Sequence, residues 1–199
     1  MNLIQKYYRL HNTLFNDKSI LIALGPLALR LFLVPVFWVA GNNKIAGFEG
    51  VVGWFGPDGL DLPLPWAMAF LATATEIVGG ALLLLGLATR WIAIPLMITM
   101  LVAIFSVHWP HGWQASHDLM SWGANADAEE ALRRLGIAKD ILREYGNYDW
   151  LTEKGHLASS NNGMEFGVTY FVMLLALFCS GGGKYFSLDY YLDKHFRPS

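Results

Sequence analysis

One carboxylate, Glu76, stands inside a long apolar run of the chain. The run, ATATEIVGGALLLLGLATRW (72–91), contains no other charge before Arg90. A charge at the centre of a bilayer costs about 2.5–3.5 kcal/mol on insertion scales. Ionisable groups at that depth are therefore usually paired, and they commonly mark a site for a proton, an ion or a polar ligand. This is the chemistry that Glu76 suggests.

Arg30 is the predicted partner of Glu76. It lies ten residues after Ile20, where the first apolar run begins, and Glu76 lies eleven residues before Leu87, where the second run ends. At 1.5 Å per residue, both side chains would lie about 15 Å from the same membrane boundary. We therefore predict a buried Arg30–Glu76 ion pair. It could be a purely structural bridge, or a site for a proton, a polar headgroup or a quinone-like ligand.

Small residues surround Glu76 on its helix face and favour such a contact. Residues at three- and four-residue spacing share one face of a helix, and small side chains there let a second backbone approach closely. The residues on this face are Ala69, Ala72, Thr73, Glu76, Gly79 and Gly80. We expect Glu76 to point into a helix interface and away from lipid.

Other ionisable and metal-binding side chains are expected at the opposite membrane boundary. Lys44, His108 and Glu165 could form an outer polar layer, although each could equally reach water by itself. Imidazole and thioether groups outside the cytoplasm would suit copper, but Met at helical spacing commonly fills a core, and the spacing matches no defined metal site. The candidate metal ligands are His108, His111, His117, Met97 and Met100.

The elements that must position these residues are membrane helices. The 199 residues are 54% hydrophobic and only 15% charged, whereas soluble domains carry about 25% charged residues. Four apolar runs approach the ~20 residues that cross a bilayer: 20–40, 66–87, 91–107 and 163–179. The first run is too long for a signal-peptide core. We predict an all-α membrane protein, a four-helix transmembrane bundle that forms a single transmembrane domain over 1–199.

The distribution of Lys and Arg predicts the orientation of this bundle. Positive residues gather on the cytoplasmic side, which places both termini in the cytoplasm. The segment 108–162 then becomes an external insert, with a helix over 127–146 that opens with a capping box from Asp127 to Glu130. The glycine-rich SGGGKYF (180–186) lacks a Walker sequence and is expected to be a flexible exit from the last span. The net charge of −2 gives no indication of nucleic-acid binding.

Three segments resemble the DoxX family. They are RLFLVPVFWVAGNNK (30–44), TEIVGGALLLLGLATR (75–90) and SLDYYL (187–192). The resemblance implies an arginine and a trailing lysine on the first helix, an acid followed by paired glycines on the second, a Thr-Arg exit, and Ser-Leu-Asp after the fourth. These motif residues are Arg30, Lys44, Glu76, Gly79, Gly80, Thr89, Arg90, Ser187 and Asp189.

The insert 126–155 is similar to the HvfX branch of that family. This resemblance implies a protein of the bacterial inner membrane that works beside copper-binding modified peptides (bufferins) and their maturation enzymes. Other DoxX relatives are similar to subunits of quinone-linked oxidoreductases and to membrane partners of redox enzymes. The leading expectation is thus a non-catalytic membrane component of a copper-peptide or redox system, embedded in the lipid bilayer.

The alternative is a quinone-binding or electron-transfer subunit of a membrane oxidoreductase, with the quinone around Arg30 and Glu76. The chain contains no Ser/His/Asp arrangement, CxxC or HExxH that would indicate a catalytic site. A small transporter is disfavoured because the sequence shows no inverted repeat or interrupted helix pair. Copper and quinone are therefore the two cofactors to be weighed.

Overall fold

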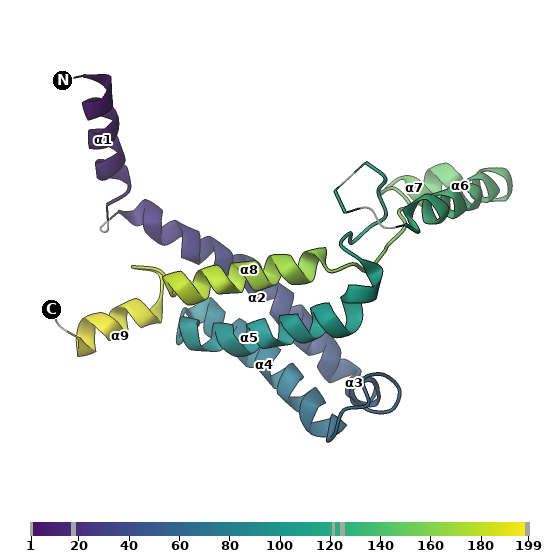
Figure 1. Ribbon diagram of the computed structural model, residues 1–199, viewed down its shortest axis with the longest axis horizontal. Coiled ribbons are helices and arrows are strands. Elements are labelled where there is room, and N and C mark those ends of the chain that lie inside the picture. Colours follow the sequence, from purple (N-terminus) through teal and green to yellow (C-terminus); the bar gives the residue numbers. More distant parts are fainter. Residues whose placement is uncertain (1, 17–18, 121, 124–125, 198–199) are drawn as a thin grey trace. The chain divides into compact units, whose positions relative to one another are not determined.

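The computed structural model describes residues 2–16, 19–120, 122–123 and 126–197. Within these ranges the regular structure is helical, and the only β pairing is an isolated bridge between Ser116 and Ser160. The α-helices, shown in Figure 1, are α1 (Leu3–Leu14), α2 (Ile20–Ala46), α3 (Phe48–Phe55), α4 (Pro65–Leu85), α5 (Thr89–Ala103), α6 (Ala128–Tyr145), α7 (Tyr148–Thr152), α8 (Glu165–Ser180) and α9 (Leu188–Phe196). One π-helical turn (Ile104–His108) and one 3₁₀ turn (Trp109–His111) follow α5.

The chain divides into two compact units. The first contains Met1–Thr99 and Tyr170–Ser199, and the second contains Met100–Thr169. The boundaries fall inside α5 and α8, so each of these two helices is divided between the two units.

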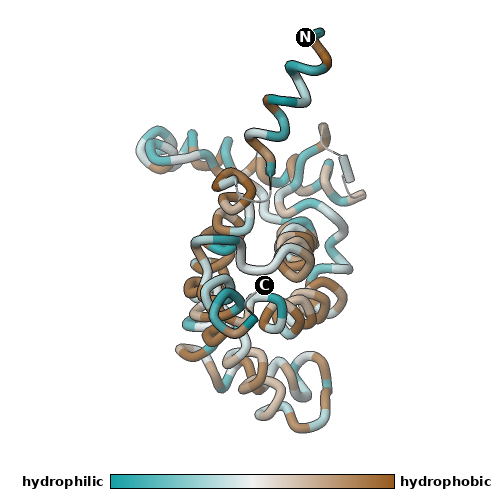
Figure 2. The backbone as a smooth tube through the Cα atoms, turned by 90° about the vertical axis from the view of Figure 1, so that its left-hand side faces the viewer, coloured by the Kyte–Doolittle hydropathy of each residue, from teal (hydrophilic) through white to brown (hydrophobic). Residues whose placement is uncertain are grey.

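Among the described residues, three helices are long and apolar enough to cross a membrane. They are Ile20–Ala46, Pro65–Leu85 and Thr89–His111, the last of which includes the π-helical and 3₁₀ turns after α5. Much of the tube in Figure 2 is brown, which marks hydrophobic residues. The fourth predicted span is α8, which is apolar but has only 16 residues, or about 24 Å against a hydrocarbon core of about 30 Å. The protein is thus a multi-pass membrane protein, and the four-helix bundle stays a prediction.

Helices α2 and α4 pack closely and run antiparallel in the first unit. Gly41 of α2 lies against Ile77, while Val34, earlier in α2, lies beside Gly80, later in α4. Small residues permit this approach. The predicted small face of α4 is confirmed except at Ala72, which is only half-buried. The buried residues of α4 are Ala69, Thr73, Glu76, Gly79, Gly80 and Leu83.

The second unit contains the predicted external helix. Helix α6 matches the expected range 127–146 closely, but the predicted capping box is wrong, because the side chain of Asp127 makes no cap hydrogen bond. Glu130 instead accepts hydrogen bonds from Arg133 and Arg134 at 2.7 and 2.8 Å. These bonds lower the pKa of Glu130 to about 2. Two guanidinium groups within one helical turn therefore compete successfully with the helix terminus for this carboxylate.

The contact at Gly41 gives a testable prediction. A Cβ at this position would lie 2.8 Å from the side chain of Ile77 and 3.2 Å from its backbone nitrogen, so α2 and α4 would have to separate. We expect Gly41→Ala to lower the free energy of unfolding by about 1–3 kcal/mol, measured by thermal unfolding in detergent. The control is Gly50→Ala in α3, where no heavy atom lies within 4 Å and Ala should be neutral or stabilising. Equal stability of the two variants would contradict the packing described here.

Candidate functional site

The predicted ion pair between Arg30 and Glu76 is wrong. Glu76 is paired with Lys44, and among the described residues Arg30 donates only to backbone carbonyl oxygens. The register of the two helices explains the difference. Arg30 lies beside Leu83 and Leu84, in the last turn of α4, so the first ten residues of α2 extend past the end of α4. The two apolar runs therefore do not begin and end at a common level.

Lys44 and Glu76 form a bidentate ion pair between α2 and α4. The Nζ of Lys44 donates to Oε1 and Oε2 of Glu76 at 2.8 and 2.7 Å. Glu76 lies one residue from the middle of α4, and its side chain is 3% exposed, whereas that of Lys44 is 29% exposed. Lys44 lies near the end of α2, and its flexible stem lets the ammonium group reach the carboxylate of Glu76.

This ion pair has unused hydrogen-bonding capacity. A Lys ammonium has three N–H donors, and two of them are directed at Glu76. The third has no partner among the described residues. The hydroxyl of the neighbouring Thr73 donates its hydrogen to the carbonyl oxygen of Ala69 in the same helix, at 2.7 Å. It therefore does not donate to the carboxylate of Glu76. The pair can accordingly hold a proton or donate to a polar group that enters from the more exposed Lys44 side.

Arg30 joins two segments that are distant in the sequence. Its Nε and Nη2 donate to the carbonyl oxygens of Leu83 and Leu84 at 2.6 and 2.9 Å. Its Nη1 donates to those of Gly182 and Phe186 at 2.7 and 3.0 Å. The residue is 1% exposed, so these carbonyl oxygens take the place of water around the cation. We call Arg30 and these four carbonyl groups the Arg30 cluster.

The end of α4 supplies carbonyl groups that suit a cation. Gly86 adopts a left-handed conformation (φ 63°), and the N–H groups of Gly86 and Leu87 bond Leu83 and Leu82. This is the Schellman pattern, which provides hydrogen-bond donors for only some of the carbonyl groups in the last helical turn. Arg30 donates to the carbonyl of Leu84, which this pattern leaves unpaired, and adds a second hydrogen bond to the carbonyl of Leu83. The partial negative charge at a helix C-terminus also favours a cation there.

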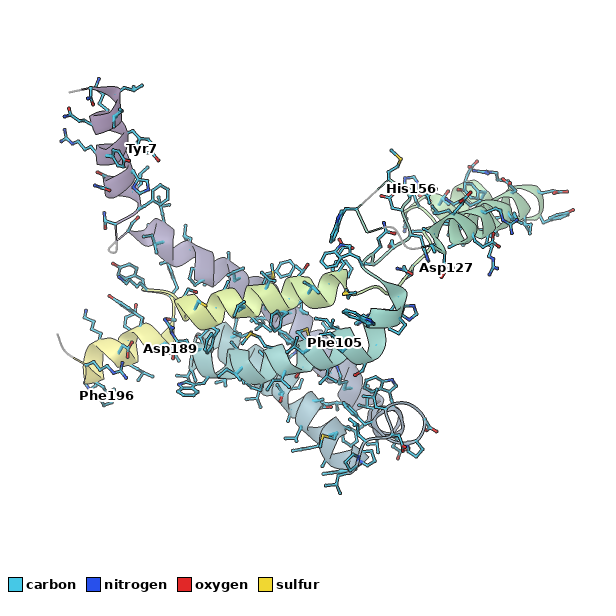
Figure 3. The ribbon with its side chains drawn as sticks, viewed as in Figure 1. Tyr7, Phe105, Asp127, His156, Asp189 and Phe196 are labelled. Atoms are coloured by element: carbon cyan, nitrogen blue, oxygen red, sulfur yellow. The ribbon has the colours of Figure 1, made fainter. Side chains whose placement is uncertain are left out.

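Ser187 and Asp189 attach the C-terminal helix to the same place. Asp189 accepts from the N–H groups of Ala88 and Thr89 at 2.6 and 2.9 Å and thereby caps the start of α5 (Figure 3). Its own N–H donates to the carbonyl of Gly86. Ser187 caps α9 and donates to the carbonyl of Gly183. The glycine-rich segment 180–186 is thus held by several bonds, and the prediction of a flexible exit is wrong.

Gly86 is a residue of this site that the sequence analysis did not single out. A Cβ on Gly86 would lie 2.6 Å from Cζ of Arg30 and 2.6 Å from Cβ of Ser187. The nearby Thr89 is completely buried, and its hydroxyl has no hydrogen-bond partner in the described part of the chain. The available signal was the glycine directly after a leucine run, which is typical of a helix C-terminus.

Arg90 lies on the exposed side of these contacts. It donates to the carbonyl of Phe178 near the end of α8 at 3.1 Å. It also lines an open groove of about 440 Å³ together with Lys184, Asp189 and Arg197. The groove is of mixed charge, because the acidic residues Asp189 and Asp193 line it together with the three basic residues. Five of the predicted motif residues therefore lie around the turn between α4 and α5: Arg30, Thr89, Arg90, Ser187 and Asp189.

The remaining predicted residues do not form one group. Lys44 and Met97 belong to the first unit, and the others belong to the second. In the second unit, Nδ1 of His108 bonds the carbonyl of Asn162 at 2.7 Å, Nδ1 of His117 bonds Ser159 at 3.1 Å, and Glu165 accepts from the N–H of Ala115. His111 is exposed, whereas Met100 is buried. Among the described residues, no group of three or more His, Cys, Asp or Glu is arranged to hold a metal ion.

The Arg30 cluster predicts a large difference between two conservative substitutions. Lysine retains the charge of Arg30 but lacks the planar fork that reaches both segments, so it leaves buried carbonyl groups unpaired. We expect Arg30→Lys to lower the free energy of unfolding by about 2–5 kcal/mol. Arg90→Lys is the control, since Arg90 is exposed and makes one carbonyl bond, and it should cost under about 1 kcal/mol. Thermal unfolding in detergent measures both, and a wild-type midpoint for Arg30→Lys would refute the role given to Arg30.

Comparison with known proteins agrees with the family suggested by the sequence. Residues 25–109 match the DoxX family model. The chain is 38% identical over 84 residues to a protein of Bacillus subtilis (strain 168) named "Putative oxidoreductase CatD". The aligned segment covers 42% of this chain and 60% of that protein. The chain thus spans about 60% of the length of this relative. No solved structure matches. The matched segment contains Arg30, Lys44 and Glu76 within two of the helices long enough to span a membrane, and residues 25–109 of this multi-pass membrane protein are similar to the DoxX family.

Proposed function

We propose that this protein is the membrane component of a redox system in a bacterial inner membrane, and that the Lys44–Glu76 pair binds the polar head of a membrane-soluble redox molecule of the quinone class. The observation that carries the proposal is the buried ion pair with one free ammonium N–H. Ionisable residues inside a membrane are costly and commonly functional. The relative named as a putative oxidoreductase supports a redox setting.

The ligand class follows from the chemistry around this pair. A quinone carries carbonyl oxygens that accept hydrogen bonds, and its apolar tail dissolves in the bilayer. The third N–H of Lys44 supplies a donor, and Glu76 holds the ammonium in place through two bonds. The lipid-side surface of α2 is apolar, with Trp38, Val39 and Ile45 each about half exposed. These apolar side chains can contact the tail of such a ligand.

A copper-peptide system is the second candidate. It is favoured by His108, because a carbonyl oxygen only accepts, so the contact between its Nδ1 and Asn162 requires a protonated Nδ1. In the neutral ring the Nε2 lone pair then remains available, which is how metal-binding histidines are commonly oriented. Of the other predicted ligands, His111, His117 and Met100 belong to the same unit as His108, and Met97 does not. In this case the protein would serve a copper-binding modified peptide and would itself be non-catalytic.

The proposed orientation in the membrane can be tested with reporter fusions. With both termini in the cytoplasm, fusions at Thr89 and after Lys194 should report a cytoplasmic location, while fusions near Asn147 should report an external one. The physical reason is the accumulation of Lys and Arg near the cytoplasmic ends of spans. A cytoplasmic signal at Asn147 would contradict the orientation.

The binding proposal is tested by quinone content and stability together. Lys44→Met and Glu76→Gln each remove one partner, and leaving a buried charge unpaired costs about 3–5 kcal/mol. A double variant, Lys44→Met with Glu76→Met, removes both charges and should recover much of that stability. We expect the parent protein to retain quinone on purification and the stable double variant to lose it, as measured by extraction and chromatography. Lys139→Met, at a half-exposed position of α6, is the control and should retain the quinone.

The same preparations distinguish the two candidates. Copper retained without quinone, and lost when His108 and His111 are replaced, would favour the copper-peptide candidate over the quinone proposal. A double Lys44/Glu76 variant that is stable and binds quinone like the parent would reduce the ion pair to a structural bridge.

A further inference from the structure

Helix α1 exposes a complete apolar face. Successive residues of an α-helix are rotated by 100°, which places its large apolar side chains on one side: Leu3, Ile4, Tyr7, Tyr8, Leu10 and Leu14. The opposite side carries Gln5, Lys6, Arg9, Asn12 and Thr13. The alternation of the two kinds of residue along the N-terminal helix is visible in Figure 2. No residue of α1 is buried, and Leu10 is 59% exposed.

This helix needs a partner surface to be stable. Its start is well formed, because the side chains of Asn2 and Gln5 and their backbone N–H groups make a reciprocal capping box. However, a helix of 12 residues is marginal in water, where helices depend on packing of their apolar face. Figure 3 shows Tyr7 on α1, and the described residues of the chain bury neither Tyr7 nor any other residue of this helix.

The neighbouring part of the chain indicates which surface covers α1. Helix α2, which is of membrane-spanning length, begins at Ile20. Five residues separate it from the end of α1 at Leu14, and five residues span at most about 17 Å. The first turns of α2 expose Ile20, Leu21 and Leu24, as a helix does where it contacts lipid. The end of α1 therefore stays within about 17 Å of the start of α2.

Charge and aromatic side chains fit the same surface. Residues 1–16 contain Lys6 and Arg9 and no acidic residue. On the apolar side, His11 lies between the rings of Tyr7 and Phe15, with ring centroids 5.9 and 5.3 Å apart. Aromatic rings are enriched at the membrane–water interface, and cations on the polar side of an amphipathic helix contact anionic lipid headgroups.

We propose that α1 lies in the plane of the membrane surface, with its apolar face among the acyl chains and Lys6 and Arg9 against anionic phospholipid headgroups. The occupant of the exposed face is the bilayer leaflet at which α2 enters. The binding surface is independent of the Lys44–Glu76 site, so failure of one proposal leaves the other standing.

The test uses the full chain in nanodiscs that contain anionic phospholipid. In a Cys179→Ser background, single cysteines replace Ile4, Leu10 or Leu14 on the apolar side and Gln5, Asn12 or Thr13 on the polar side, and each receives a nitroxide label. Collisions with oxygen report lipid, and collisions with a water-soluble nickel chelate report water. We expect a several-fold higher oxygen-to-nickel ratio at the three apolar positions than at the three polar positions.

The other outcomes overturn the proposal. High nickel access at all six positions places α1 in water. Low access to both reagents on the apolar side shows that a protein, such as a second copy of the chain, covers this face. A charge test uses Lys6→Gln with Arg9→Gln, for which membrane binding of α1 should fall roughly five-fold per cation in anionic discs. An unchanged ratio at Leu10 in those discs would refute the role of the two cations.

Discussion

The guanidinium group of Arg30 is the contact on which the first unit depends. It is buried, and it replaces its hydration shell with carbonyl oxygens from the end of α4 and from the segment 182–186. A cation at a helix C-terminus is favourable, and a buried cation is tolerated only where hydrogen bonds satisfy it. Since these two segments are distant in the sequence, Arg30 connects the start of the DoxX-like segment to the C-terminal part of the chain. Asp189 reinforces this connection by capping α5.

The second charged residue of α2 is stabilised in a different way. Lys44 lies fourteen residues after Arg30, or about 21 Å along the helix, and pairs with the carboxylate of Glu76. Carbonyl dipoles around Arg30 are fixed by the backbone, whereas Glu76 is itself ionisable and Lys44 is partly exposed. The Arg30 cluster is therefore suited to holding structure, and the Lys44–Glu76 pair is suited to exchanging a proton or a ligand. This contrast is the reason for placing the function at the ion pair.

The match to the DoxX family ends at residue 109, yet the contacts of the matched segment extend beyond it. Ser187 and Asp189 lie outside the matched segment, and both make contacts around the turn between α4 and α5. The glycine in that turn, Gly86, has no space for a side chain because Arg30 and Ser187 lie on either side. The segments 83–90 and 182–189 thus constrain each other. A substitution that alters one of these segments is therefore expected to change the conformation of the other.

The sequence by itself determined the helical class, the apolar spans, the small face of α4 and the place of α6, because these depend on periodicity and composition within one segment. It also indicated which residues carry the unusual charges. Only the tertiary structure decided their partners. Counting residues from the end of each apolar run places Arg30 and Glu76 at one depth only if the two runs end in a common plane. Helix α2 instead begins well before the level at which α4 ends. The register of α2 against α4 is set by the contacts of Gly41 and Gly80, so Glu76 is brought to Lys44 and Arg30 to the carbonyl groups.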